Sequence, residues 1–202
     1  MEKSDEAKRI RDDLMAFEAS PLYTYRTENG FLPVLGEGSL DAKIMFVGEA
    51  PGLNEAKTGK PFCGAAGKFL DELIASIGLK REDVYITNIV NDRPPENRDP
   101  MPEEIAYYSP FLDRLVQIIQ PKVIVSLGRH SMTYLMQRYD LDLELDAISK
   151  IHGKSFDTVY FDKDNVPHPV TIVTLYHPAA ALYNGGMRDT LKQDFQVLKP
   201  FV

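Results

Sequence analysis

Four short, mainly apolar runs rich in β-branched residues recur along the chain. They are Lys43–Val47, Val84–Val90, Val123–Leu127 and Val170–Leu175. Runs of this length without regular polar alternation are typical of strands that are buried on both faces, as in parallel sheets. The hydrophobic pattern therefore predicts four parallel strands.

Between these runs, the apolar positions recur with the period of a helix. Further helices are expected over Lys3–Glu18 and from about Arg129. Alternating strands and helices favour right-handed βαβ units, with helices on both faces of the sheet. We therefore expect an α/β protein, a three-layer α/β/α sandwich around a central, mainly parallel four-stranded sheet. The two clearest helix faces are Phe69, Leu70, Leu73, Ile74 and Ile77, and Phe111, Leu112, Leu115, Val116 and Ile119.

Length and composition favour one folding unit. With 202 residues, of which 44% are hydrophobic, the chain can bury one sizeable core. We expect a single domain over residues 1–202, with an N-terminal helix within residues 1–19 packed on it. The polar segment 144–169 interrupts the alternation and is expected to contain a short hairpin.

Charge and cysteine content argue against several classes of protein and of binding site. No run approaches the roughly 18 apolar residues of a membrane span, and the charged opening MEKSDEAKRIRDDL is unlike a signal peptide, so we expect a cytoplasmic protein without a membrane partner. Cys63 is the single cysteine, which excludes an intramolecular disulfide and sites built from several thiolates. The formal charge of −7 disfavours indiscriminate binding to polyanions but allows a local basic face.

Polar residues stand at the ends of the predicted strands. Glu49 follows the first strand in GEAPG, Asn88 lies in the second in ITN, and His177 follows the fourth in YHPAA. Ligands of open α/β sheets bind beyond the carboxyl ends of the strands. A carboxylate, an amide and an imidazole at that edge predict an active site.

These groups suit a planar heterocycle with adjacent carbonyl and N–H groups. Glu49 can orient or deprotonate water, Asn88 offers a donor and an acceptor side by side, and His177 can donate to a developing anion. Phe62, in the glycine-rich loop GKPFCGAAG, can stack on a ring, and the glycines let the backbone approach a ligand closely.

Each of these residues also has an ordinary structural interpretation. Glu49 can cap a helix, Asn88 can belong to a turn or a buried network, and His177 can be a satisfied loop residue. Phe62 can be a core residue. Residues expected to be structural or exposed rather than reactive are Cys63, His130, His152 and His168.

Several short motifs occur in a fixed order along the chain. They are GEG at 36–38, GEAPG with Glu55, GKPFCGAAG, VYITNIV, RPPENRDP, QPKVIVSLGR, HG at 152–153, and YHPAA. No single motif is specific, but together they span most of the chain, and their order and spacing resemble the uracil-DNA glycosylase superfamily, and within it the family 4 type. The resemblance implies an α/β/α domain that flips uracil out of DNA and hydrolyses its N-glycosidic bond, leaving an abasic site.

The resemblance also implies a role for each site residue. Glu49 would position or activate water, Asn88 would contact the O4 and N3–H edge of uracil, and His177 would donate to O2 of the departing base. Phe62 would stack on the base. The backbone at Gly48 and Ala50 and the loop from Gly64 to Gly67 would hold the ring or flanking phosphates, and a basic rim for DNA is expected from Arg93, Arg98, Arg129, Arg188 and Lys192.

The chain departs from family 4 in its cysteines. Family 4 enzymes usually carry four cysteines that ligate an iron–sulfur cluster, at positions that fall here within Ser20–Arg26, at Asp92 and at Tyr108. A cubane cluster needs about four thiolates, which one cysteine cannot supply. We therefore expect no iron–sulfur cluster and no other cofactor or metal. The residues expected to fill the gap are Tyr23, Tyr25, Tyr107 and Tyr108, with Asp92 paired to Arg26.

Two alternatives stay open. The altered segment LYNGGMRD after YHPAA and the negative charge also fit a member that binds uracil-containing DNA, or a protein, without turnover. The second alternative is a glycosylase for another deaminated or damaged base. The presence of Glu49, Phe62, Asn88 and His177 favours catalysis on uracil. The expected partner is uracil-containing DNA, single- or double-stranded, and the expected oligomeric state is a monomer.

Overall fold

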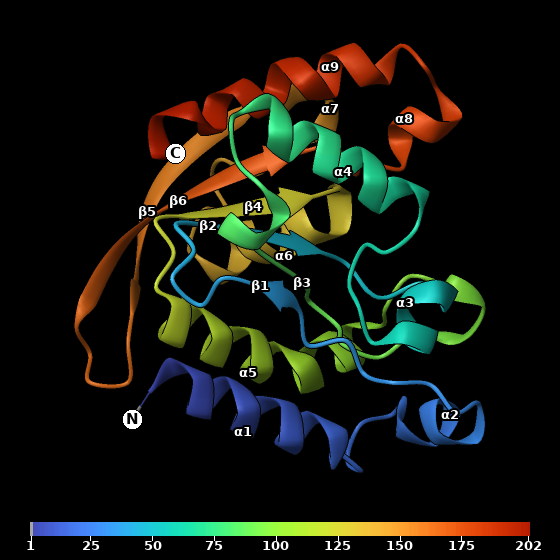
Figure 1. Cartoon of the computed structure of the whole chain (residues 1–202). Coiled ribbons are helices and arrows are strands. Elements are labelled where there is room, and N and C mark those ends of the chain that lie inside the picture. The colour runs from blue at the N-terminus through green and yellow to red at the C-terminus, as the bar shows by residue number, and fades with distance from the viewer. Residues whose placement is uncertain (1) are drawn as a thin grey trace.

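A six-stranded sheet forms the middle layer of the computed structural model, which describes residues 2–202 (Figure 1). The strand order is β1-β3-β2-β4-β6-β5. The four inner strands are mutually parallel and coincide with the four apolar runs, which confirms the expected α/β class. These strands are β2 (Ile44–Gly48), β3 (Tyr85–Asn88), β4 (Val123–Leu127) and β6 (Pro167–Leu175).

The expected number of strands, four, was wrong because two antiparallel edge strands complete the sheet. β1 (Glu37–Gly38) pairs with β3, and β5 (Lys154–Phe161) pairs with β6. β1 is two exposed residues long, and β5 alternates exposed and half-buried residues, so neither carries a buried apolar run. β5 and β6 form the hairpin expected in segment 144–169, and its arms project beyond the helical layers (Figure 1).

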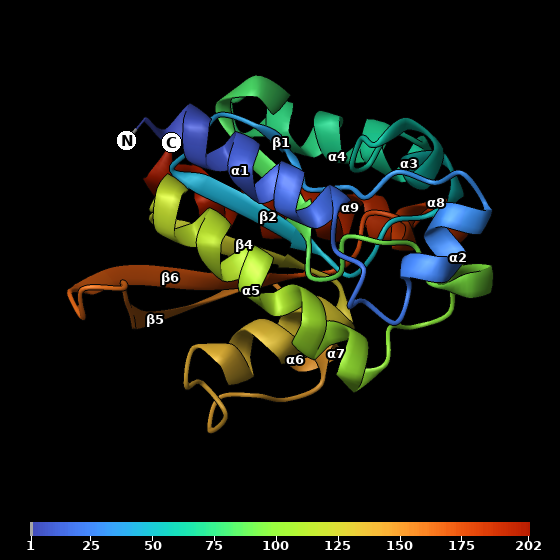
Figure 2. The same ribbon diagram turned by 90° about the horizontal axis from the view of Figure 1, so that it is seen from below.

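Helices flank the sheet on both faces, as Figures 1 and 2 show. Among residues 2–202, no helix has both the length and the apolar character needed to cross a membrane. The helices are α1 (Lys3–Met15), α2 (Tyr23–Glu28), α3 (Leu53–Thr58), α4 (Ala65–Ser76), α5 (Pro102–Ile119), α6 (Arg129–Arg138), α7 (Ile148–Ile151), α8 (Ala180–Tyr183) and α9 (Met187–Asp194), with 3₁₀ turns at Arg81–Asp83, Pro95–Asn97 and Phe195–Phe201.

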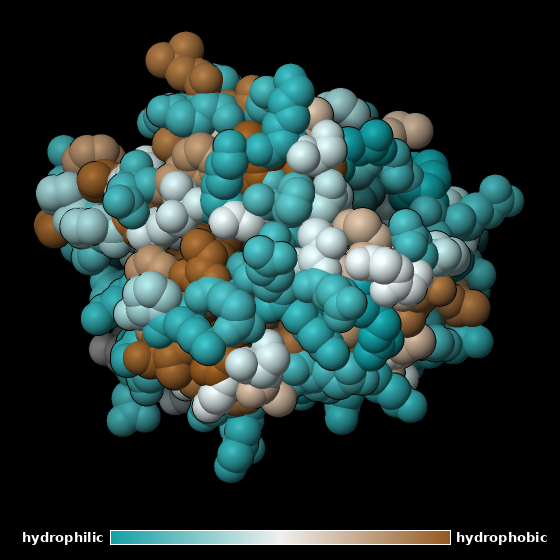
Figure 3. All heavy atoms as spheres, turned by 90° about the horizontal axis from the view of Figure 1, so that it is seen from above, coloured by the Kyte–Doolittle hydropathy of each residue, from teal (hydrophilic) through white to brown (hydrophobic). Residues whose placement is uncertain are grey.

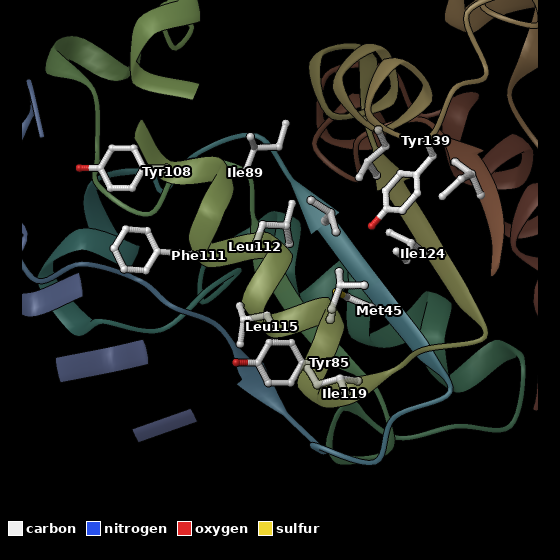
Figure 4. Packing of buried hydrophobic residues seen from close by; sticks show 14 of the residues in the cluster. Met45, Tyr85, Ile89, Tyr108, Phe111, Leu112, Leu115, Ile119, Ile124 and Tyr139 are labelled. Atoms are coloured by element: carbon white, nitrogen blue, oxygen red, sulfur yellow. The ribbon is translucent and has the colours of Figure 1, made fainter. Parts of the chain in front are cut away.

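Alternate residues of β2 face opposite layers, as the period of a strand requires. Phe46 belongs to the core that also contains the apolar faces of α4 and α9, whereas Met45 belongs to the core with α5 and α6. Figure 4 shows Met45 and Ile124 beside Leu112 and Leu115 of α5. On the outer face above α4 and α9, hydrophilic side chains dominate and apolar ones lie in small groups (Figure 3).

A buried polar network joins the N-terminal segment to the chain that follows β3. The Tyr108 hydroxyl donates to Asp92 over 2.5 Å and lies 2.5 Å from the Ser20 hydroxyl, while Arg26 lies 3.3 Å from the same carboxylate. None of these four side chains is more than 5% exposed, and we call them the Asp92 network. Burial raises the pKa of Tyr108, and the Asp92 carboxylate raises it further, so the hydroxyl stays protonated and can donate.

Arg26 of the Asp92 network also ends helix α1. Its guanidinium donates to the carbonyls of Leu14 and Met15, over 3.0 and 2.8 Å, which satisfies acceptors left free at a helix C-terminus. The helix therefore ends at Met15 rather than at Glu18 as expected. Phe17 then turns inward, with its ring centroid 5.1 Å from that of Phe111.

The other tyrosines expected in this region lie nearer the surface. Tyr107 is 38% exposed, and the Tyr25 hydroxyl accepts a hydrogen bond of 2.9 Å from Arg93. Tyr23 lies beneath the Arg26 guanidinium, 5.0 Å from ring centroid to carbon. The interior space at the expected cluster positions is thus filled by Tyr108 and the predicted Asp92–Arg26 pair. Ser20, which the sequence did not single out, completes it.

Tyr108→Phe should lower the free energy of unfolding by about 1–3 kcal/mol, because Asp92 and Ser20 would lose a buried hydrogen-bond partner without a change in packing volume. The matched control is Tyr107→Phe, whose hydroxyl lies on an exposed residue and should change stability little. Urea denaturation of both variants measures the difference. Equal effects of the two substitutions would contradict a structural role for the network.

Candidate active site

The carboxyl ends of β2 and β3 bring Gly48 directly beside Asn88. A Cβ atom at position 48 would overlap the Asn88 side-chain oxygen and lie 2.9 Å from the Phe62 ring. Glycine is therefore required for the amide and the ring to meet over this backbone. Asn88 is 3% exposed and Phe62 7% exposed, so both lie inside the fold rather than on a mobile surface loop.

Phe62 is held in an unusual backbone conformation. Its φ is +48°, in the left-handed region that bulky side chains seldom adopt and that costs about 1–3 kcal/mol. Arg81 fixes the preceding residue by donating to the Pro61 carbonyl over 2.5 Å while pairing with Asp71. Gly67, expected to contact DNA, is buried against the Phe62 carbonyl, where any Cβ would collide. The Arg81 hydrogen bond on one side and the packing of Gly67 on the other thus hold the strained backbone of Phe62, which supports a functional role for its ring.

His177 follows β6 and faces Phe62 across the site, with ring centroids 5.5 Å apart and planes at 28°. The backbone N–H of Ala179 donates to His177 Nδ1 over 3.1 Å. Burial lowers the pKa of His177 to about 4, so the ring is neutral at neutral pH. Because Nδ1 accepts, the neutral ring carries its proton on Nε2, which leaves that N–H to donate to a ligand.

Glu49 follows Gly48 and is half-buried. Burial raises the pKa of its carboxyl above the ordinary 4.5; His130 lowers it, Asp99 raises it and Arg129 lowers it. His130 was expected to be structural or exposed, yet the carboxylate oxygens of Glu49 and Asp99 and a ring nitrogen of His130 all lie within 4.8 Å of one another. The GRHS segment after β4 carried a signal for this position, since β4 ends at the same sheet edge as β2.

The arginines expected at a basic rim are largely engaged within the chain. Arg93 donates to Asn97 and to the Tyr25 hydroxyl, and Arg188 pairs with Glu72 over 2.7 Å while covering the Phe69 ring. Arg98 makes two hydrogen bonds to Glu104. Among the other expected contacts, Arg129 and Lys192 are exposed, and Ala50 and Gly64 are half-buried.

The cluster of Glu49, Asp99 and His130 is the one group in residues 2–202 whose ligand atoms lie close enough together for a cation. Arg129 donates to the His130 ring nitrogen over 2.8 Å, however, so a cationic group already occupies the space beside it. We therefore assign no metal to it. The arrangement offers an aromatic face, an amide, an imidazole N–H and a carboxylate at one sheet edge, a set that can bind a flat polar ring and act on a bond beside it.

Comparisons with known proteins identify the family of the chain. The family model of the uracil DNA glycosylase superfamily matches residues 35–199. A Type-4 uracil-DNA glycosylase of Sulfurisphaera tokodaii is 45% identical over 196 residues, which cover 96% of this chain and 84% of that protein. Type-4 uracil-DNA glycosylases of Archaeoglobus fulgidus (44% identity, 85% of this chain, 82% of that protein) and Saccharolobus solfataricus (42%, 96% and 86%) are also similar.

The low pKa of His177 predicts a specific dependence of stability on pH. In the unfolded chain the imidazole takes up a proton near pH 6.5, whereas in the folded chain it does so only near pH 4. The free energy of unfolding should therefore fall as the pH drops from about 6.5 to 4, and this component should be missing in His177→Gln. Denaturant titrations of both proteins across that range measure the difference, and parallel pH curves would contradict the burial of a neutral ring.

Proposed function

The chain belongs to the uracil-DNA glycosylase superfamily, and on that basis we propose how the residues of this site excise uracil from DNA. The protein is a uracil-DNA glycosylase, a DNA-binding hydrolase of base excision repair that breaks the N-glycosidic bond of a uracil nucleotide. One observation carries the assignment of residues. Gly48 allows Asn88 and Phe62 to meet at the sheet edge that His177 also faces.

Base recognition combines stacking with an amide. A uracil flipped out of the helix stacks on Phe62, which returns about 1–3 kcal/mol of the cost of extraction. The Asn88 amide donates to O4 and accepts from N3–H, while the backbone at Gly48 and Ala50 supports the ring. Cytosine reverses the donor and acceptor at that edge, so the same amide orientation disfavours it.

His177 stabilises the leaving base. As the bond from C1′ to the base nitrogen breaks, its electron pair stays with the base and negative charge builds up on the base oxygens. The N–H on Nε2, fixed by the Ala179 hydrogen bond to Nδ1, donates to O2. A neutral imidazole suits this role because burial disfavours its charged form.

Glu49 serves the incoming water. The sugar approaches an oxocarbenium ion as the base departs, and water adds to C1′ while its proton passes to the carboxylate. Glu49 is half-buried and directly follows Gly48, which supports its role as the base beside the bound ring. Its ionised form also opposes the positive charge that develops on the sugar.

Exposed cations and a helix N-terminus are the features that we expect to contact the DNA strand. Arg129 and Lys192 supply exposed cations, and Gly64 starts helix α4 with free backbone N–H groups near the loop. Beyond His177, Leu182 and Tyr183 are 46% and 89% exposed, which suits apolar wedges that fill the space of a flipped base.

We propose that the enzyme accepts uracil in single- or double-stranded DNA and acts as a cytoplasmic monomer.

We further propose that the protein works without an iron–sulfur cluster or other cofactor. Cys63 is the one cysteine of the chain, and it is exposed in the base-binding loop. The positions where the resemblance places cluster ligands are occupied by members of the Asp92 network, whose polar groups already bond one another. These side chains offer no thiolate, and their polar atoms are already bonded to one another, so they do not fit an iron–sulfur cluster.

His177→Ala should lower the single-turnover rate on an oligonucleotide with one uracil by about 10²–10³, because the developing anion would lose its donor. The matched control is His168→Ala, an imidazole in the β5–β6 hairpin that bonds Asp162, and its rate should equal that of the parent protein. Full activity of His177→Ala would refute the assignment. A parent protein that shifts the labelled DNA without making alkali-labile sites would instead be a binder.

Protein purified under anaerobic conditions should be colourless and contain no stoichiometric iron, and its melting temperature should not change in chelator. The reason is that hydrogen bonds and packing, not metal bonds, hold the N-terminal segment. Iron assay, absorption spectra and thermal melts test this. A brown protein with bound iron, or one that unfolds on chelation, would overturn the proposal.

A further inference from the structure

His130 and Asp99 lie beside the Glu49 carboxylate on segments that are distant in sequence. The ligand atoms of the three side chains are all within 4.8 Å of one another. His130 Nε2 lies 3.3 Å from Asp99 Oδ2 and 2.8 Å from Arg129 Nη2. The imidazole therefore has a partner in each protonation state, because a neutral ring can accept from Arg129 and a charged ring can donate to Asp99.

The loop that carries Asp99 is held in place. Arg98 makes hydrogen bonds of 2.9 and 2.6 Å to Glu104 and donates to the Asp99 carbonyl over 3.0 Å. Glu104 is 3% exposed and also accepts from the backbone N–H of Met101. Although the Asp99 side chain is 66% exposed, its backbone is thus fixed on both sides.

We propose that His130, held by Asp99, is a positioning residue for Glu49, and that it keeps the carboxylate ionised and oriented toward the attacking water. This inference rests on the proposed role of Glu49 as the base. Burial alone makes a charged carboxylate less favourable, and a cation within a few ångströms offsets that cost. Neither His130 nor Asp99 needs to touch the substrate.

Three charged groups act on Glu49, from two elements. Burial raises the pKa of the carboxyl, the His130 imidazolium from α6 lowers it, Asp99 from the loop raises it, and Arg129 from α6 lowers it. His177, on the β6 side, is neutral above about pH 4 and adds no charge there. The two cations that act on Glu49, His130 and Arg129, thus both come from the start of α6.

The test is the dependence of the single-turnover rate on pH, with an oligonucleotide that carries one uracil. His130→Gln removes the cation, so the acid limb should move to higher pH. At a pH on that limb the rate should fall about threefold to tenfold, while the plateau rate should change less than about twofold. His130→Lys keeps a positive charge and should return the limb to the parent position or below it.

Two controls separate positioning from general damage. Glu96→Gln removes a charge from the same loop as Asp99 but from a side chain that does not act on Glu49, and its profile should match the parent. In an Asp99→Asn background, His130→Gln should move the limb less, because the imidazole has lost the carboxylate that holds it beside Glu49. A limb that stays in place while the titration of the Glu49 carboxyl is also unchanged would overturn the inference.

A second measurement distinguishes this inference from the role of Glu49 itself. Carbon-13 NMR titration of the Glu49 carboxyl, assigned with Glu49→Gln, reports its ionisation without any substrate. A titration midpoint that rises in His130→Gln supports the inference, even if the rate does not follow, in which case Glu49 is not the base. An unchanged midpoint in His130→Gln overturns it whatever the rates show.

Discussion

The pairing of Gly48 with Asn88 at the ends of β2 and β3 is the constraint on which the site depends. It places a residue without a side chain beside the Asn88 amide and the Phe62 ring, so this part of the site is built on strand backbone. A slip of one residue would turn Asn88 to the other face of the sheet. The buried apolar residues on both faces of β2 oppose such a slip, which means that the two hydrophobic cores also fix the geometry of recognition.

Burial has opposite consequences for the two ionisable groups of the site. It keeps His177 neutral, with its proton on Nε2, the atom that donates in the proposed role. It also disfavours the ionised form of Glu49, which is the form that the proposed base needs. The surroundings differ accordingly, since a backbone N–H orients His177, whereas charged side chains gather around Glu49. The same low-dielectric edge thus serves a neutral donor and an anion.

The sequence predicted the inner strands and the edge at which Glu49, Asn88 and His177 stand, because buried runs and strand ends are local signals. It did not predict β1 or β5, whose residues lack a buried run. Asp99 was missed because its approach to His130 depends on how segment 92–101 folds back, a tertiary event without a local signature. The hydrogen bond of Arg93 to Tyr25 and the ion pairs of Arg98 with Glu104 and of Arg188 with Glu72 were missed because each partner comes from another segment or turn.

The Asp92 network also bears on the order in which the chain acquires its structure. Ser20 and Tyr108 are 88 residues apart, and Arg26 and Asp92 are 66 apart. During synthesis the N-terminal helix emerges first, but its attachment point on α5 does not yet exist. Its docking must therefore wait until Tyr108 has left the ribosome, and the first 26 or so residues remain without their buried partners while the base-binding loop is already made.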